Sequence, residues 1–454
     1  MTTTITTTRP STKPATRPLL AAHPARHYYR DTFDQDIPLR ESSAAAGPPK
    51  TQKVATTAQT GTSCATTTKG YWAPALDTTR YLRTSARVRK QKHPSQVQLI
   101  DLFAGCGGLS IGFRQATDSL GIEMHTVVAV EMDHAASATY ASNFGDHVYL
   151  GKIEEWLKEE VLPSCDVMVG GPPCQGFSAL GKQDPKDPRN KLWKSYVEAV
   201  ARIRPKFFIM ENVPQFQKSR EYKLLLKETS SGALKDYDLQ TFVFAANRHG
   251  TPQRRKRAIV IGRLKGYAPV ETEALQEEMT VRQAWRGLST RVAPSKKLPK
   301  RPGQYRSKKI EGPFSTTELH IQGPMSDRIR EMVKAIPAGG NRFDLPEELQ
   351  YDCWKKGSYN GGDVMGRLSW NAPSVTIRTQ FFKPDKGRYI HPSADRAITY
   401  AEAAFLQGFP ADYQWCGSPA QIAKQIGNAV PVPLAAMVGR IVLRSYLQGV
   451  SNGK

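Results

Sequence analysis

One stretch of the sequence decides the fold: Val167-Met168-Val169-Gly170-Gly171-Pro172-Pro173-Cys174-Gln175-Gly176-Phe177-Ser178. Its apolar start predicts a buried strand, and the glycines and prolines that follow permit close backbone approach and end any helix. Ligands bind beyond the carboxyl ends of parallel strands, so this turn displays the Cys174 thiol at the mouth of a sheet. A lone cysteine is usually a small buried side chain. A cysteine that only packs in a core needs neither the Gly-Gly-Pro-Pro sequence before Cys174 nor the Gly-Phe-Ser sequence after it, which favours a functional thiol.

The composition narrows the class of protein. The chain has 454 residues, enough for two or three domains, and its formal net charge of +23 favours a polyanionic partner. Charge alone does not separate DNA from RNA or an anionic membrane. No apolar run approaches the roughly 20 residues of a membrane span, so we expect a soluble protein. The six cysteines form no CxxC pair, so neither a zinc site nor a disulfide framework is indicated.

Residues 1–95 read as a tail. They are rich in Thr, Ala, Pro and Ser, they lack apolar periodicity, and basic residues cluster between Arg80 and Lys92. This composition predicts a disordered basic segment. A non-specific DNA arm, an organellar transit peptide and a segment that serves solubility alone all fit it, and we favour the first or the last.

A second stretch of the sequence indicates a site for a ligand of the nucleotide type. Residues 96–103 read as a strand, followed by the glycine turn 104–110 and a helical pattern. Such a turn lets a ligand touch the backbone, but alone it is a weak signal. The next strand ends in Glu131, and an acid at the tip of a second strand is placed to hold ribose hydroxyls. The pairing of the two features predicts a cofactor site.

Two later segments carry further candidates. The apolar run 205–210 ends in Glu211-Asn212, on a strand that would neighbour the strand before Cys174. A Glu-Asn pair at a strand end is common in structural roles, but a thiol at the matching tip favours a functional one. Residues 250–257 form a basic turn between two strands, which in isolation would be an ordinary connection.

Together these motifs resemble the DNA (cytosine-5) methyltransferase family, in its single-chain, restriction-modification type. Gly-Pro-Pro-Cys-Gln-Gly-Phe-Ser at 171–178 looks like the family's nucleophile loop, and Phe-x-Gly-x-Gly-Gly at 103–108 resembles its S-adenosylmethionine site. Six motifs stand in the family's usual, unpermuted order over about residues 96–450. The resemblance implies an α/β fold with a Rossmann-like, mixed but mostly parallel sheet and a smaller irregular target-recognition domain.

The implied domains follow this order. The tail occupies residues 1–95, the catalytic and cofactor-binding domain 96–264, the target-recognition domain 265–418, and a C-terminal segment that returns to the catalytic domain 419–454. The tail has no room for large folded regulatory domains, which favours a stand-alone modification enzyme.

The resemblance implies a reaction and its catalytic residues. A methyl group passes from S-adenosylmethionine to carbon 5 of a flipped cytosine in double-stranded DNA, through a covalent adduct of the cysteine at carbon 6. The catalytic residues are Cys174, Glu211, Asn212, Arg255 and Arg257. A carboxylic acid at Glu211, its pKa raised by burial, would bond ring nitrogen 3. Arg255 would reach the carbonyl oxygen of the cytosine, with Arg257 in support.

The resemblance also implies cofactor and DNA contacts. Cofactor contacts are expected from Phe103, Gly105, Gly107, Leu109, Glu131, Met132, Pro172, Leu192, Asn428 and Val430. DNA contacts are expected from Gln175, Gly176, Ser178, Arg189, Gln253, Lys296, Lys297, Arg301 and Thr376. The basic run 296–309 is interpreted as phosphate contacts beside base-reading loops, although no residue can be assigned to a base. The last element, with Asn428 and Val430, should fold back against the first glycine loop.

One position departs from the family pattern. After the third strand the family usually has Gly-Asp-Ile, whose Asp meets the adenine amino group, whereas this chain has Gly151-Lys152-Ile153. A lysine cannot accept a hydrogen bond. Either Glu154 or the backbone substitutes, or adenine is held more weakly.

Two other functions remain open. The transfer-RNA branch of the superfamily has Pro after Pro-Cys-Gln and a Cys-Phe-Thr element, and this chain has Gly176 and no such element. A catalytically silent DNA-binding module is favoured only by Lys152, since Cys174, Glu211 and Arg255 are all present. We expect a monomer that acts on double-stranded DNA, with a possible cognate restriction endonuclease for the same site. In a bacterium we expect it in the cytoplasm, associated with the nucleoid. In a eukaryote we expect it in the nucleus.

Overall fold

The structure, a computed structural model, describes residues 96–159, 161–173, 192–355 and 361–452. The chain divides into two units, Met1–Thr68 and Lys69–Lys454, and every described residue belongs to the second. The predicted tail 1–95 and the predicted nucleophile loop from Cys174 onward therefore lie outside the described residues.

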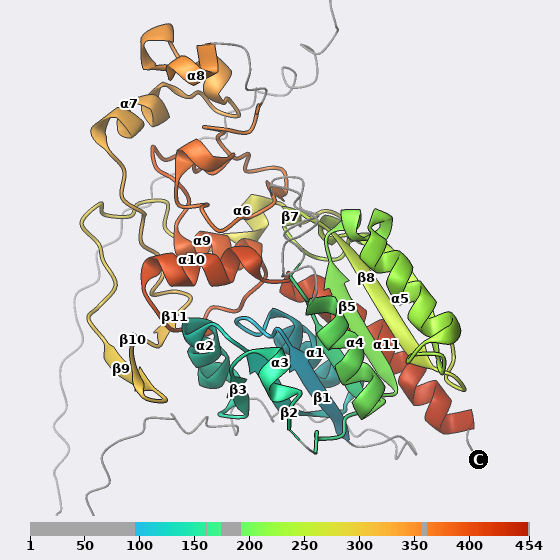
Figure 1. The fold of residues 1–454 in the computed structure, drawn as a ribbon. Helices are drawn as coiled ribbons and strands as arrows, with labels where there is room; N and C mark the ends of the chain where they lie inside the picture. Colours follow the sequence, from blue (N-terminus) through green and yellow to red (C-terminus); the bar gives the residue numbers. More distant parts are fainter. Residues whose placement is uncertain (1–95, 160, 174–191, 356–360, 453–454) are drawn as a thin grey trace, which may run out of the picture. The chain divides into compact units, whose positions relative to one another are not determined.

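A mixed sheet organises the first half of the described chain (Figure 1). Its strands are β1 (Gln96–Leu102), β2 (Glu123–Glu131), β3 (Val148–Leu150), β4 (Val167–Gly170), β5 (Phe207–Asn212), β6 (Tyr237–Ala245) and β8 (Lys256–Leu264). They lie side by side in the order β3-β2-β1-β4-β5-β8-β6. The first five strands run parallel, and β8 is antiparallel to both β5 and β6. The chain changes direction across the sheet at β1, the kind of switch point where α/β sheets bind ligands.

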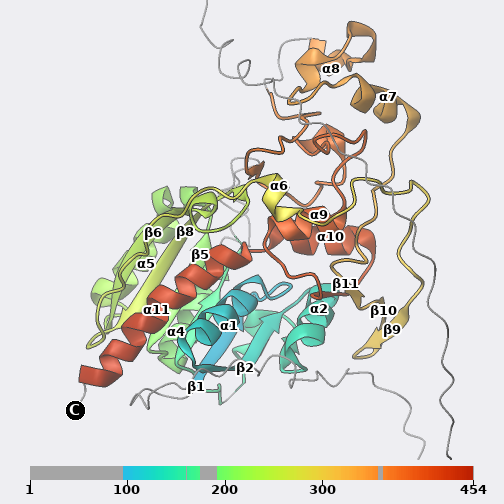
Figure 2. The ribbon, with the colours of Figure 1, turned by 180° about the vertical axis from the view of Figure 1, so that it is seen from behind.

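Helices cover both faces of this sheet (Figures 1 and 2). On one face, α1 (Gly108–Leu120) and α11 (Val432–Asn452) share a core with strand residues such as Leu99 and Val169. On the other face, α4 (Leu192–Ile203) packs against residues such as Ile100. Neighbouring strand residues point to opposite faces, so the near-continuous apolar strands supply both cores. The remaining helices of this half are α2 (His134–Phe144), α3 (Ile153–Trp156) and α5 (Arg220–Ser231).

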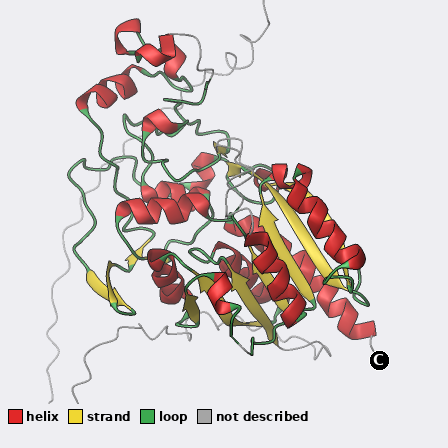
Figure 3. Ribbon diagram, in the orientation of Figure 1, coloured by secondary structure: helices red, strands yellow, loops and turns green. Residues whose placement is uncertain are grey.

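The second half consists mostly of loops with short elements, as Figure 3 shows. Its helices are α6 (Val281–Ala284), α7 (Asp327–Ala335), α8 (Asp352–Lys355), α9 (Tyr400–Leu406) and α10 (Pro419–Asn428). Its short strands are β7 (Gln253–Arg254), β9 (Pro302–Tyr305), β10 (Lys308–Glu311), β11 (Phe314–Ser315), β12 (Ser374–Val375) and β13 (Gln414–Trp415). A separate apolar core, with Trp285, Phe381, Tyr400 and Trp415 among its members, holds these pieces together.

The C-terminal segment belongs to both cores. Ile422 and Ile426 of α10 pack in the second core, whereas α11 packs against α1. Helices α1 and α11 meet at Gly112 of α1, where an added Cβ would lie 2.4 Å from the Cβ of Ala435 of α11. In the part of the chain that the structure describes, no single helix is long and apolar enough to cross a membrane, and α10 and α11 pass that test only together, across a bend of 41°.

Candidate active site

Glu211 and Arg257 meet at the carboxyl end of β5. Glu211 pairs with Ile259 in the antiparallel β5–β8 ladder, and Arg257 lies two residues before Ile259 on the same side of β8. The Arg257 Nε atom lies 2.5 Å from Glu211 Oε1, and only 13% and 14% of the two side chains is exposed. The sheet thus holds a mostly buried ion pair at a strand tip.

The turn that leads to Cys174 lies against this pair. A Cβ added to Gly171 would come within 3.0 Å of Glu211 Oε2. Asn212 Nδ2 donates to the carbonyl oxygen of Pro172 at 3.3 Å, and its Oδ1 accepts from Val213 N at 2.8 Å. The Gly-Gly-Pro-Pro approach is therefore tied to the tip of β5. Outside the described residues lie Cys174, Gln175, Gly176, Ser178 and Arg189.

The two arginines of this segment lie in different surroundings. Arg255 lies between β7 and β8 and belongs to neither strand, so its side chain does not follow the alternation of side chains along β8. Its guanidinium donates to the carbonyl oxygens of Ile377 at 2.9 Å and Gly427 at 3.3 Å. It is 4% exposed, and burial followed by the charge of Arg257 lowers its pKa well below the usual value. Arg257, expected only in support, is the arginine beside Glu211.

Gln253, which was expected at the DNA, bonds inside the protein, and its DNA contact stays a prediction. Gln253 is fully buried; its Oε1 accepts from Ile377 N at 2.8 Å and its Nε2 donates to Gln407 Oε1 at 2.9 Å. Both ends of its side-chain amide therefore form hydrogen bonds that join β7 to the second core. Thr376 is half-buried and donates to the carbonyl oxygen of Arg254 at 2.8 Å, so its predicted DNA contact stays a prediction.

The predicted cofactor residues gather at the ends of β1 and β2. Glu131 Oε2 accepts from Gly105 N at 2.8 Å, and Oε1 accepts from Asp133 N at 2.7 Å. Burial raises the pKa of Glu131, against the effect of these two bonds. The Met132 side chain beside it is 63% exposed. Two backbone donors thus fix the carboxylate next to an exposed thioether.

The glycine turn has one open side and one closed side. Phe103, Gly105 and Gly107 all have left-handed backbone angles, with φ values of 57°, 56° and 86°. A Cβ added to Gly105 would meet nothing within 4 Å, whereas a Cβ on Gly107 would lie 2.5 Å from the Phe144 ring. The open side at Gly105 is room for a ligand, and Gly107 is required for packing.

The last predicted motif lies against this turn. A Cβ added to Gly108 would come within 2.8 Å of the Val430 carbonyl oxygen, so the segment after α10 does fold back on the first glycine loop. Val430 and Leu109 are buried in one core, and Asn428 is exposed. Leu192 begins α4 and is half-buried. The cofactor contacts of these residues stay predictions.

At the departure from the family pattern, Lys152 and Glu154 are both exposed. The Lys152 peptide nitrogen donates to Glu155 Oε2 at 3.4 Å at the start of α3. The side chain of Lys152 is therefore not committed to the core.

Sequence reasoning missed a buried carboxylate next to the glycine turn. Asp101 is fully buried at the end of β1 and accepts from Ser110 Oγ at 2.7 Å, and Ser110 Oγ lies 2.7 Å from the Tyr140 hydroxyl. Its second oxygen, Oδ1, has no hydrogen-bond partner in the described chain. Burial raises the pKa of Asp101 to about 7. The sequence of β1 gives no sign of the partners of Asp101, Ser110 and Tyr140, which come from other elements.

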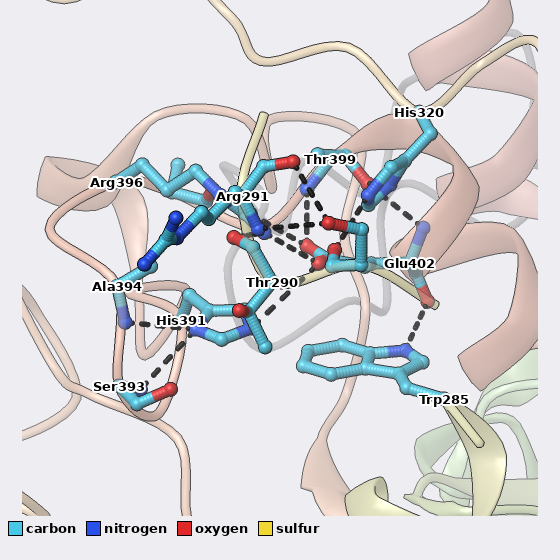
Figure 4. Close-up of polar contacts among 12 residues, drawn as sticks. Trp285, Thr290, Arg291, His320, His391, Ser393, Ala394, Arg396, Thr399 and Glu402 are labelled. Atoms are coloured by element: carbon cyan, nitrogen blue, oxygen red, sulfur yellow. Dashed lines mark hydrogen bonds and ion pairs between the residues drawn. The ribbon is translucent and has the colours of Figure 1, made fainter. Parts of the chain in front are cut away.

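A buried charged cluster, also missed, stabilises the second core (Figure 4). Arg396 forms a two-point ion pair with Glu402, at 2.8 and 2.7 Å. Trp285 Nε1 donates to the Glu402 carbonyl oxygen at 2.9 Å. His391 Nδ1 accepts from Ala394 N at 2.9 Å, and burial lowers the pKa of His391 to about 4. The cluster fixes the start of α9.

The comparisons with known proteins agree with this geometry. Residues 97–444 match the family described as C-5 cytosine-specific DNA methylase. The Type II methyltransferase M1.HphI of Haemophilus parahaemolyticus is 31% identical over 356 residues, 76% of this chain and 86% of that protein. The Type II methyltransferase M.NgoFVII of Neisseria gonorrhoeae is 32% identical over 338 residues, 74% and 83% of the two chains.

Solved structures show the same fold. A prophage-encoded protein of Escherichia coli aligns with a TM-score of 0.56 at 23% identity, over 77% of this chain and 99% of that one. The Entamoeba histolytica methyltransferase EhMeth aligns with a TM-score of 0.52 at 17% identity, over 77% and 99%. The expected fold class, a methyltransferase with a mostly parallel mixed sheet, is confirmed. The chain belongs to the C-5 cytosine-specific DNA methylase family and is a DNA cytosine-5 methyltransferase.

Proposed function

We propose that the protein is a modification enzyme that transfers a methyl group from S-adenosylmethionine to carbon 5 of a flipped cytosine in double-stranded DNA, through a covalent adduct of Cys174 at carbon 6. The observation that carries the proposal is the ion pair of Glu211 and Arg257, with Gly171 against it, at the neighbouring tips of β4 and β5. Cys174 follows that turn by three residues in the sequence. This closeness in the sequence supports a joint role of the thiol and the acid.

The thiolate of Cys174 adds to carbon 6, which breaks the aromaticity of the ring and makes carbon 5 nucleophilic. This addition is easier when ring nitrogen 3 carries a proton, which Glu211 can share. The ion pair with Arg257 holds the Glu211 carboxyl group in one orientation. The remaining N–H groups of Arg257 can donate to the carbonyl oxygen of the base. We therefore assign to Arg257 the role expected of Arg255.

The residues at the ends of β1 and β2 fit S-adenosylmethionine. Gly105 has open space on its Cβ side, and the Glu131 carboxylate is oriented by two backbone donors. We assign the ribose to Glu131 and the adenosine to Phe103 and Met132. When bound, this cofactor supplies a methyl group on a positively charged sulfur, which a nucleophilic carbon can attack. A base, water included, then removes the proton from carbon 5 and the thiolate leaves.

The partners follow from the substrate. DNA is bound as duplex, and the target base leaves the stack because its ring atoms are otherwise out of reach. The relatives M1.HphI and M.NgoFVII are named Type II methyltransferases, which supports a restriction-modification role with a cognate endonuclease for the same site. We propose a monomer that acts where the DNA lies, at the nucleoid in the cytoplasm if the source is bacterial.

The test is methyl transfer to competing nucleic acids. The protein, with S-adenosylmethionine carrying a labelled methyl group, should convert cytosine in unmethylated duplex DNA to 5-methylcytosine and leave structured transfer RNA unlabelled. Label in the RNA alone would favour the transfer-RNA branch. No label in either, with cofactor binding no better than in a Gly105→Ala/Glu131→Gln double variant, would favour the silent module.

A further inference from the structure

The carboxylate that we assign to the ribose is held by a neighbour that is itself anchored. Glu131 Oε1 accepts from the Asp133 peptide nitrogen at 2.7 Å, and Oε2 accepts from Gly105 N at 2.8 Å. Asp133 caps the start of α2, where its Oδ1 accepts from Ala135 N at 3.1 Å and from Ala136 N at 3.2 Å. The orientation of the Glu131 carboxylate therefore depends on where Asp133 is anchored.

The second carboxylate oxygen of Asp133 bonds a residue from near the end of the chain. Lys424 Nζ lies 2.8 Å from Asp133 Oδ2, and the two residues are 291 positions apart in the sequence. Lys424 belongs to α10, which lies beside α2 in both views (Figures 1 and 2). Ile422 and Ile426 of the same helix are fully buried in the second core. A helix that is fixed in the second core thus holds the loop that carries Glu131.

Lys424 also offsets a charge that acts on Glu131. Burial is the main cause that raises the pKa of Glu131, and the negative charge of Asp133 raises it further. Burial alone would raise the pKa of Asp133 too, but the Lys424 ammonium group and two peptide N–H groups hold it below its ordinary value. Asp133 is therefore ionised. Within the ranges that the structure describes, no second cation forms an ion pair with Asp133.

We propose that Lys424, acting through Asp133, positions Glu131 for the ribose of the cofactor, so that Lys424 and Asp133 are positioning residues for S-adenosylmethionine. The inference rests on the proposed function, which assigns the ribose to Glu131. A binding group keeps its direction only when the residues behind it are fixed as well. The side chains of Lys424 and Asp133 are 60% and 31% exposed, so water competes for the pair and the expected effect is modest.

The test uses S-adenosylhomocysteine, which is the cofactor after loss of its methyl group and binds without reacting. In calorimetric titrations, Lys424→Met should weaken its binding roughly three- to fivefold, the upper range for an exposed ion pair. Lys424→Arg keeps the charge and should recover most of the affinity. Asp133→Asn should match Lys424→Met, because asparagine still caps α2 but lacks the charge. The double variant should bind no more weakly than either single variant.

Selectivity for the ribose separates positioning from a purely structural role. The 2′,3′-dideoxy analogue of S-adenosylhomocysteine lacks the hydroxyl groups that we assign to Glu131, so it should bind the parent protein more weakly. The ratio of the two Kd values should move toward one in Lys424→Met, as in Glu131→Gln. In the Glu131→Gln background, Lys424→Met should have no further effect. In turnover, Lys424→Met should raise the KM for the cofactor and leave kcat unchanged.

The matched control is an ion pair of equal length at the other end of the strands. Arg204 Nη1 lies 2.8 Å from Asp236 Oδ2, near the start of β5, and the two side chains are 55% and 42% exposed. Asp236→Asn should leave both Kd values unaltered. An equal loss of affinity in this control would reject the inference, because loss of charge alone would then explain the effect. Unchanged affinity in Lys424→Met, or a further loss in the Glu131→Gln background, would also overturn it.

Failure of the proposed function would look different. If the parent protein binds no S-adenosylhomocysteine, the cofactor assignment is wrong and the inference is rejected with it. If the parent binds this ligand and prefers the ribose, but Lys424→Met does so equally, the inference alone is rejected. The cofactor assignment then stands on the parent protein.

Discussion

Arg257 Nε lies 2.5 Å from Glu211 Oε1, so an acid on β5 and a cation on β8 share one mostly buried position. Both side chains project from strands of the central sheet and not from the turn that carries the thiol. Rigid elements position reacting groups better than loops do. The acid that the proposed chemistry needs is therefore oriented by the central sheet.

Glu211→Gln should lower kcat by about 10²- to 10⁴-fold, the usual contribution of a positioned general acid or base. Glutamine keeps the shape but cannot share a proton with ring nitrogen 3. Stopped reactions with labelled S-adenosylmethionine measure the change. Glu198→Gln, at an exposed position on α4, is the matched control and should behave like the parent. Unchanged turnover in Glu211→Gln would remove Glu211 from the mechanism.

Substitution of Arg257 should lower the activity, whereas substitution of Arg255 should lower the stability. Arg257→Lys should lower kcat at least tenfold and leave the melting temperature within a few degrees, because it loses the donor that meets Glu211. Arg255→Met should instead destabilise the fold by about 1–3 kcal/mol per lost bond, because the Ile377 and Gly427 carbonyl oxygens become unpaired. Paired measurements of kcat and thermal unfolding separate the two. A stable, inactive Arg255 variant would restore the role first expected of Arg255.

Gly171→Ala should reduce kcat roughly tenfold, about 1.4 kcal/mol, without unfolding the protein. The new Cβ would lie 3.0 Å from Glu211 Oε2, so the carboxylate must move. At Gly362 an added Cβ would meet its nearest neighbour at 3.7 Å, an ordinary contact, and Gly362→Ala should be neutral. Equal activity of the two variants would show that the fit between Gly171 and Glu211 has no catalytic consequence.

Asp101 should make stability depend on pH. Its pKa is about 7 in the folded protein and near 3.9 in the unfolded chain, so between these values the folded state binds more protons. The free energy of unfolding therefore falls as pH rises through this window, by up to about 4 kcal/mol from this group. Asp101→Asn should lose that component. Urea unfolding of both proteins from about pH 4.5 to about pH 8 measures it, and parallel pH profiles would contradict the assignment.

The sequence predicts the strand tips because their signals are local. Apolar runs that end in Glu131, Glu211 or a glycine turn specify strands whose carboxyl ends meet at one edge, and the structure has them there. The fold class follows from the same rhythm of strands and helices. Asp101 is missed because its role depends on burial beside Ser110 and Tyr140, which no local pattern reveals.

The directions of side chains and the packing of distant segments against one another could not be predicted from the sequence. Whether Arg255 or Arg257 faces Glu211 depends on the break between β7 and β8, and Gln253 is buried because residues from another core close over it. The contact of Tyr305 with His134 joins residues 171 positions apart. Such docking is decided by packing between elements, which periodicity does not encode.

The most direct test of the central claim, covalent catalysis by Cys174, is trapping with DNA that contains 5-fluorocytosine in the target sequence, in the presence of S-adenosylmethionine. Fluorine at carbon 5 cannot leave as a cation, so the enzyme should stall as a covalent adduct after methyl transfer. The account predicts a denaturation-resistant complex whose DNA-linked peptide contains Cys174, and which Cys174→Ser does not form. A complex linked through another residue, or no complex with DNA that the same enzyme methylates, would contradict it.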